Sequence, residues 1–130
     1  MKALQPPGWP RPKGYSNGIS ARGRMILTAG VVGWDETETF VADTLPGQFA
    51  QALQNIVAIL ADDGAGPEHL VRMTAYVVDI DAYRASLHEI GDAWKQIIGR
   101  NYPAMALVEV RALVEPEALV EIEATAVVEE

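Results

Sequence analysis

The sequence has 130 residues, 49% of them hydrophobic, and a formal net charge of −8. This length fits one compact domain spanning residues 1–130, and the apolar content excludes a disordered chain. Because there is no cysteine, the chain has no disulfide framework, no thiol nucleophile and no cysteine-ligated metal. The ten basic residues are scattered through an acidic chain, which is not the pattern of a nucleic-acid-binding protein.

The N-terminal residues 1–14 are rich in proline and predict an extended arm. They contain no apolar run like that of a signal peptide, and no later stretch reaches the ~18 apolar residues of a membrane helix. His69 and His88 lie far apart, so no local histidine pair suggests a metal site. We therefore expect a cytoplasmic protein with no metal or cofactor and with neither nucleic acid nor membrane as partner.

Hydrophobic periodicity predicts five strands and two helices. In chain order they are strands at residues 15–21 and 25–32, a helix at 46–62, a strand at 70–78, a helix at 81–98, and strands at 104–111 and 118–128. A tight turn at Arg22 and Gly23 predicts that the first two strands form a hairpin. Gly30 and Gly33, at the end of the second strand, indicate a bend or a close backbone approach.

Each predicted helix carries one apolar stripe at helical spacing. In the first helix the stripe is Phe49, Ala52, Leu53, Ile56, Val57 and Leu60, and in the second it is Tyr83, Leu87, Ile90, Trp94 and Ile97. Asp43 or Thr44 can cap the first helix, and Gly64 can end it. The order β-β-α-β-α-β-β predicts a two-layer α+β domain, with both helices on one face of a mixed sheet.

The last strand indicates which of its faces meets the helices. Val120, Ile122, Ala124 and Ala126 alternate as a uniformly apolar set and should pack on the helices, so Glu121 and Glu123 point the other way. We expect Met105 and Leu107 of the neighbouring strand to share this helix-free face with the two acids. A face that is half apolar and half acidic requires either water or another subunit against it.

Six stretches now resemble the Rid family, the YjgF-like proteins that include reactive-intermediate deaminases. They are GYSNGI, TAGVVGWD, QFAQALQNIVAILADDGAG, VRMTAYVVDIDAY, YPAMALVEV and VEIEATAV, and they cover nearly the whole chain in the family's order. The resemblance implies a chorismate-mutase-like fold and a homotrimer with small-molecule pockets at the subunit contacts. It also implies cofactor-free hydrolysis of reactive enamines and imines to a keto acid and ammonia.

Met105 departs from the family pattern. In the family that this chain resembles, the deaminating members have an arginine in a Pro-Ala-Arg-Ser stretch, and its guanidinium binds the substrate carboxylate. This chain has Pro103-Ala104-Met105-Ala106 at that place. A planar guanidinium matches a planar carboxylate with paired, charge-assisted hydrogen bonds, and methionine offers only apolar contact. Removing one partner of such a pair costs roughly 2–5 kcal/mol, so we expect weak binding of a small imino acid.

The resemblance assigns Glu121 to the acidic residue that positions or activates the attacking water. A carboxylate among apolar groups suits this work, and the alternative is a solvated strand glutamate. Glu123 points the same way, and we interpret it as a structural or rim residue.

The remaining candidates are substrate-binding residues implied by the same resemblance. Tyr15 matches a tyrosine that closes the pocket in the family. The alternative is that Tyr15 only packs on the hairpin. Gly33 matches the pocket edge, and Ala106 and Leu107 match positions where the main chain hydrogen-bonds substrate or water. His88 falls where deaminating relatives have an asparagine. It is either a proton shuttle or a partly solvated helix residue.

Three functions remain open from the sequence. The first is a Rid-like hydrolase for an imine or enamine that lacks the usual carboxylate contact. The second is a non-catalytic trimer that binds a small metabolite. The third is the endoribonuclease or translation-inhibitor role sometimes attached to the family, against which the net charge of −8 argues.

Overall fold

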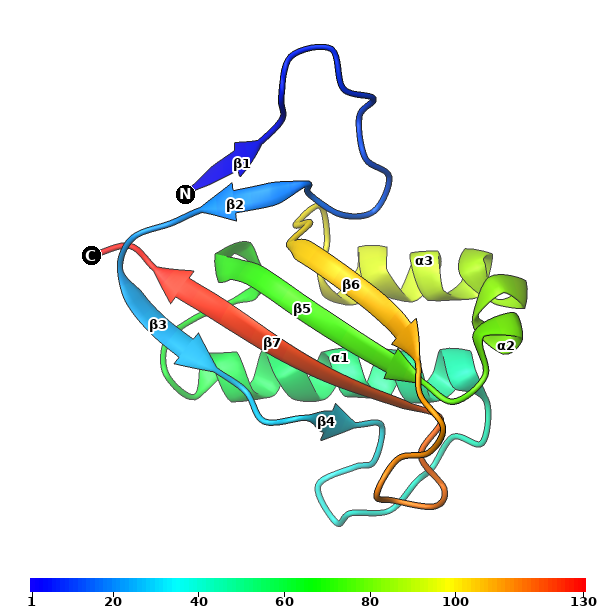
Figure 1. Cartoon of the computed structure of the whole chain (residues 1–130). Coiled ribbons are helices and arrows are strands. Elements are labelled where there is room, and N and C mark those ends of the chain that lie inside the picture. Colours follow the sequence, from blue (N-terminus) through cyan, green and yellow to red (C-terminus); the bar gives the residue numbers. More distant parts are fainter.

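The computed structural model describes residues 1–130 and has two layers, a sheet and a set of helices (Figure 1). The main sheet has the order β3-β7-β5-β6, and β4 also pairs with β7. Only β5 and β6 are parallel, so the sheet is mixed as predicted. In chain order the elements are β1 (Lys2–Leu4), β2 (Gly18–Ser20), β3 (Arg24–Leu27), β4 (Val31–Val32), α1 (Leu45–Ala61), β5 (Leu70–Val77), α2 (Ile80–Ala85), α3 (Leu87–Ile97), β6 (Ala104–Glu109) and β7 (Val120–Val128).

Helix α1 confirms the prediction closely because its sequence signals agree with one another. Thr44 is the N-cap, and its side chain accepts a hydrogen bond from the backbone N–H of Gly47. Gly64, just beyond the C-terminal end, has a φ of 73°, a conformation that glycine adopts without steric cost. The apolar stripe packs on the sheet, and its fully buried members include Phe49, Ala52, Leu53, Ile56 and Leu60. No helix of the structure is both long and apolar enough to cross a membrane.

The predicted second helix is divided in two at Ser86. The backbone there has φ −113° and ψ 13°, and its N–H bonds to the carbonyl of Tyr83, which closes α2 in a tight turn. The break turns Leu87 out of the apolar stripe and leaves it 55% exposed, so its predicted burial is wrong. Ile90 and Trp94 form the buried edge of α3 instead, together with Ile98 just beyond its C-terminal end.

The predicted hairpin between the first two strands is also wrong. Strand β2 pairs with β1, which lies within the predicted arm, and β3 pairs with β7. Gly23 has a φ of 147° and runs so close to the carbonyl of Val128 that any Cβ would overlap it. This contact directs the chain onto the C-terminal strand. A tight hairpin would instead have returned it to β2.

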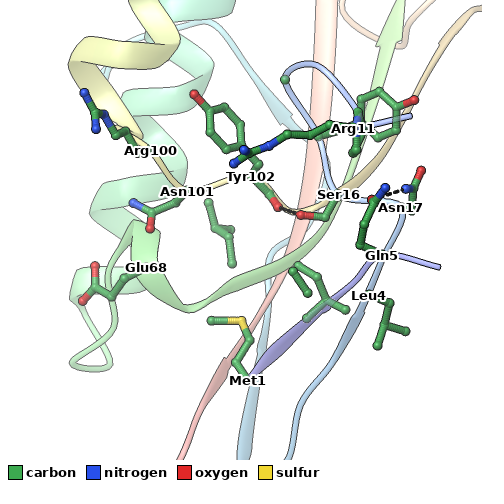
Figure 2. A pocket seen from close by; sticks show the side chains of 16 residues that line it. Met1, Leu4, Gln5, Arg11, Ser16, Asn17, Glu68, Arg100, Asn101 and Tyr102 are labelled. Atoms are coloured by element: carbon green, nitrogen blue, oxygen red, sulfur yellow. Dashed lines mark hydrogen bonds between the residues drawn. The ribbon is translucent and has the colours of Figure 1, made fainter. Parts of the chain in front are cut away.

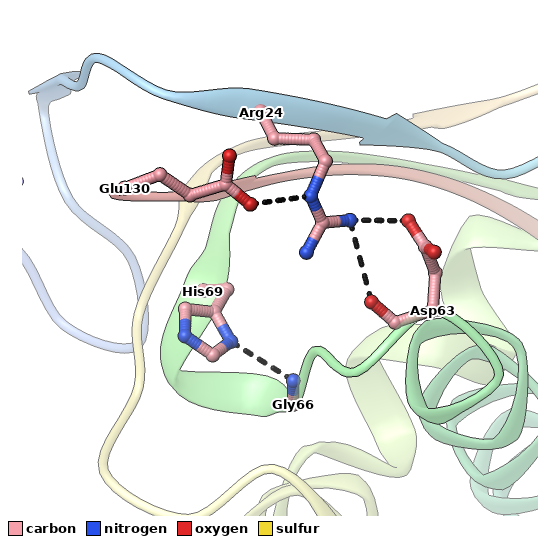
Figure 3. Close-up of polar contacts among 5 residues, drawn as sticks. All are labelled: Arg24, Asp63, Gly66, His69 and Glu130. Carbon is pink, nitrogen blue, oxygen red and sulfur yellow. Dashed lines mark hydrogen bonds and ion pairs between the residues drawn. The ribbon is translucent and has the colours of Figure 1, made fainter.

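Arg24 strengthens the same junction with polar contacts (Figure 3). Its guanidinium is 2.8 Å from the Glu130 carboxylate and also pairs with Asp63, just beyond α1. Close by, the Gly66 N–H donates to Nδ1 of His69 at 2.9 Å. Arg24 therefore connects β3, the C-terminal segment and the end of α1.

The two faces of the sheet confirm one prediction and correct another. Val120, Ile122, Ala124 and Ala126 are buried under the helices, and Glu121 and Glu123 lie on the opposite face. Met105 and Leu107 do not share the acids' face, because parallel pairing places Met105 beside Met73 and Leu107 beside Ala75. Met73 and Ala75 are fully buried under the helices, so Met105 and Leu107 lie on the helix side.

Candidate functional site

An apolar cavity of about 500 Å³ opens at the edge of the sheet, between β6, helix α3 and residues 13–15. Three predicted site residues line it: Tyr15, Met105 and Leu107. Phe49, Trp94 and Ile90 add buried apolar surface, and nine of the thirteen lining residues are hydrophobic. This volume and lining are typical of a site for a small organic molecule.

Some residues of this apolar cavity were not among the predicted site residues. Tyr83, Ile90 and Trp94 belong to a stripe that helical periodicity assigns to the core, and Phe49 comes from the other helix. Burial raises the pKa of the Tyr83 phenol, because the anion loses its hydration. The indole Nε1 of Trp94 is buried without a hydrogen-bond partner. Periodicity does not reveal that this part of the core opens to solvent.

A second cavity, of about 740 Å³, lies beside the first, between the N-terminal residues and the segment before β6 (Figure 2). Gly14, Tyr15 and Tyr102 line both cavities and form the wall between them. The Ser16 hydroxyl donates to the carbonyl of Tyr102 at 2.5 Å, and Asn17 donates to Gln5 at 2.9 Å. These hydrogen bonds hold the arm against the start of β6. We refer to this space as the arm cavity.

Glu121 lies on the other face of the sheet, half-buried on β7 opposite Val32 and Tyr76. Gly30 packs against its carboxylate so closely that a Cβ at that position would overlap the carboxylate oxygen. The Glu121 side chain has no hydrogen-bond donor and no ion-pair partner within the chain. The lone pairs of this carboxylate are therefore not occupied within the chain, and a base for water needs such free lone pairs.

Glu123 differs from Glu121 in having a fixed partner. The Tyr76 hydroxyl donates a hydrogen bond of 2.6 Å to the Glu123 carboxylate. This bond raises the pKa of Tyr76, since the bond is lost when the phenol ionises, and burial adds to the effect. The contact agrees with the interpretation of Glu123 as a structural residue.

The structure brings together only part of the predicted site. Tyr15, Met105 and Leu107 meet at the apolar cavity, whereas Glu121 and Ala106 lie on the opposite face of the sheet. Gly33 is buried, and a Cβ there would overlap the backbone of Gln48, which confirms the predicted close approach. It lines neither cavity.

His88 lies apart from both groups. Its side chain is 91% exposed and is 3.5 Å from Asp92, one turn along α3. This geometry is that of the solvated helix histidine left open by the sequence. No three histidine, aspartate or glutamate side chains come together to hold a metal ion.

The mixed sheet, covered on one face by helices and open to a cavity at one edge, defines a small two-layer α+β protein. Residues 10–128 match the family model described as endoribonuclease L-PSP. The protein YyfB of Yersinia pestis, a Rid-family protein of unknown function, superposes with a TM-score of 0.86 at 32% identity, covering 98% of each chain. The chain belongs to the Rid family, also called YjgF or RutC.

Two curated relatives agree with this assignment. A RutC family protein of Pyrococcus abyssi is 34% identical over 103 residues, which is 78% of this chain and 77% of that protein. The 2-iminobutanoate/2-iminopropanoate deaminase of Salmonella typhimurium is 30% identical over 96 residues, 74% of this chain and 73% of that protein.

Proposed function

We propose that this protein hydrolyses the C=N bond of a small imine, or of the enamine in equilibrium with it, in a homotrimer. The observation that carries the proposal is the Glu121 carboxylate, which is half-buried, held against Gly30 and free of any partner within the chain. The Salmonella relative, whose name gives it imino acids as substrates, supports the same reaction class.

In the proposed reaction Glu121 accepts a proton from water while the water oxygen attacks the imine carbon. Glu121 passes this proton to the nitrogen. The C–N bond then breaks while the new hydroxyl gives up its proton to the leaving nitrogen, so that ammonia departs and the carbon retains the oxygen as a carbonyl. This base catalysis needs no metal or cofactor.

Trimer formation would complete the site. Within one chain Glu121 and the apolar cavity lie on opposite faces of the sheet, so the carboxylate must come from a neighbouring copy to reach a ligand in that cavity. The helix-free face also exposes Met25 at 61% and Leu27 at 66%, apolar surface that a neighbouring subunit would cover.

Light scattering during gel filtration is expected to give about three times the chain mass of 14.1 kDa at micromolar concentration. Leu27→Glu, on the exposed part of the helix-free face, should shift the mass toward that of the single chain. Val114→Glu is a matched control, since Val114 is 93% exposed and lies in a loop. A monomeric wild-type protein would rule out a site shared between copies.

Met105 sets the expected limit on substrates. The wild-type protein should hydrolyse 2-iminopropanoate slowly, because no guanidinium stands at position 105 to bind a carboxylate inside the cavity. Met105→Arg should restore part of the binding of this short substrate, measured as a lower KM for ammonia release. A wild-type rate equal to that of an arginine-bearing deaminase would contradict the argument.

A metabolite-binding trimer without catalysis is the second candidate, favoured by the same methionine. Ligand binding without any turnover of imines or enamines would select it. The endoribonuclease activity named for the family model finds less support here, because the net charge of −8 opposes binding to a phosphate backbone.

A further inference from the structure

The charged residues at the mouth of the apolar cavity are all cationic. Lys13 and Lys95 are the only charged residues that line it, and both are exposed and without an ion-pair partner. In the adjoining arm cavity Arg11 and Arg100 are also unpaired, and Glu68 is the single acid among the lining residues of the two cavities. In a chain of net charge −8, the linings of the two cavities therefore carry four cations and one acid.

The interior of the same cavity has the opposite character. Met105, Leu107, Phe49 and Trp94 present apolar surface with no charged group to meet a carboxylate. At the rim, Tyr15, Leu87 and Tyr102 remain 43%, 55% and 38% exposed, which is a large apolar border for a surface that only water contacts. Apolar walls beneath a cationic mouth are complementary to an amphiphilic anion.

We propose that the apolar cavity binds an organic carboxylate with its apolar body inward, against Met105 and Leu107, and its carboxylate outward, between Lys13 and Lys95. The flexible lysine side chains can lay their methylene groups along the rim and turn their ammonium groups to the ligand. The inference rests on the proposed function, since it names the substrate class of that site: imines of larger apolar carboxylates. It also explains how a chain with methionine at position 105 still recognises an anion.

Direct binding tests the proposal without requiring turnover. Calorimetric titration of the wild-type protein at low salt would compare 4-phenylbutanoate with its uncharged amide, 4-phenylbutanamide, and with acetate. We expect the carboxylate to bind about tenfold more tightly than the amide, because each exposed charge pair contributes up to about fivefold. Acetate, which lacks the apolar body, should show no measurable binding, and added salt should weaken binding of the carboxylate.

Variants at the mouth identify the cations involved. Lys13→Met and Lys95→Met keep the apolar length of each side chain, and together they should remove the preference for carboxylate over amide. Lys2→Met, on the exposed strand β1 and outside the cavity, should leave the preference unchanged. Equal binding of carboxylate and amide by the wild-type protein, or an unchanged preference in the double variant, would overturn the proposal.

Turnover separates this failure from that of the proposed function. Hydrolysis of small uncharged imines without any binding of phenylbutanoate would overturn the substrate class and leave the hydrolase standing. Binding of phenylbutanoate without hydrolysis of any imine would support the ligand class and favour the metabolite-binding trimer. If a crystal structure showed the cavity filled by side chains of a second copy, the ligand proposal would be wrong.

Discussion

Glu121→Gln is expected to lower turnover of any imine substrate by ~10²-fold or more, the usual scale for loss of a general base. Glutamine preserves the shape of the side chain, which matters because Gly30 packs directly against the carboxylate. The amide cannot accept a proton from water, so kcat should fall while KM changes little. Ammonia release from imines generated in solution would give both values.

Glu123→Gln is the matched control for this prediction. It neutralises a carboxylate on the same strand and face, but one that is already bonded to the Tyr76 hydroxyl. We expect a much smaller effect on kcat, and we expect both variants to retain the mass of the wild-type assembly. If neither substitution changed the rate, catalysis by the Glu121 carboxylate would be excluded, and another group would have to activate the water.

The parts of the fold that could be predicted from the sequence are those determined by local periodicity, or by a strong contrast between apolar and charged residues. Helix α1 has one continuous apolar stripe and a capping threonine, and it begins and ends within a residue of the predicted bounds. The last strand contrasts four apolar residues with Glu121 and Glu123, so its buried face was assigned correctly. In both cases a single choice satisfies every residue of the element.

The predictions of strand pairing and of sheet face were wrong where the contact that determines them joins residues far apart in the sequence. Nothing near Gly23 in the sequence indicates that its backbone runs against Val128. Met105 and Leu107 alternate with Ala104 and Ala106, and all four are half-buried, so apolar character alone does not distinguish the two faces. Parallel pairing with β5 determines which of these residues face the helices.

Only part of the candidate site could be predicted, again because its residues are brought together by contacts between distant parts of the sequence. Resemblance to a family identifies residues by position, and three of the residues it named, Tyr15, Met105 and Leu107, line one cavity. It does not say that Glu121 lies on the other face of the same chain's sheet. The cationic mouth was missed because Lys13 and Lys95 are distant in sequence and meet only when the arm lies beside α3.

Gln48 is a buried polar residue whose loss should strongly destabilise the fold. Its side chain is almost fully buried, at 1% exposure, and every polar atom of it is bonded. The amide donates to the carbonyls of Ala42 and Glu117 at 3.2 and 3.0 Å, and its oxygen accepts from the N–H of Leu119 at 2.7 Å. One side chain of α1 therefore holds two loops and the approach to β7.

Gln48→Met keeps the volume of the side chain but removes all three hydrogen bonds. The backbone groups left without a partner each cost about 1–3 kcal/mol, so we expect the free energy of unfolding to fall by about 3 kcal/mol or more. Gln54→Met is the matched control on the same helix, since Gln54 is exposed, and it should change stability by less than about 0.5 kcal/mol. Urea denaturation at one fixed protein concentration would measure both, because assembly makes stability depend on concentration. Equal stability of the two variants would mean that these hydrogen bonds only replace bonds to water, and that apolar packing alone holds the loops against α1.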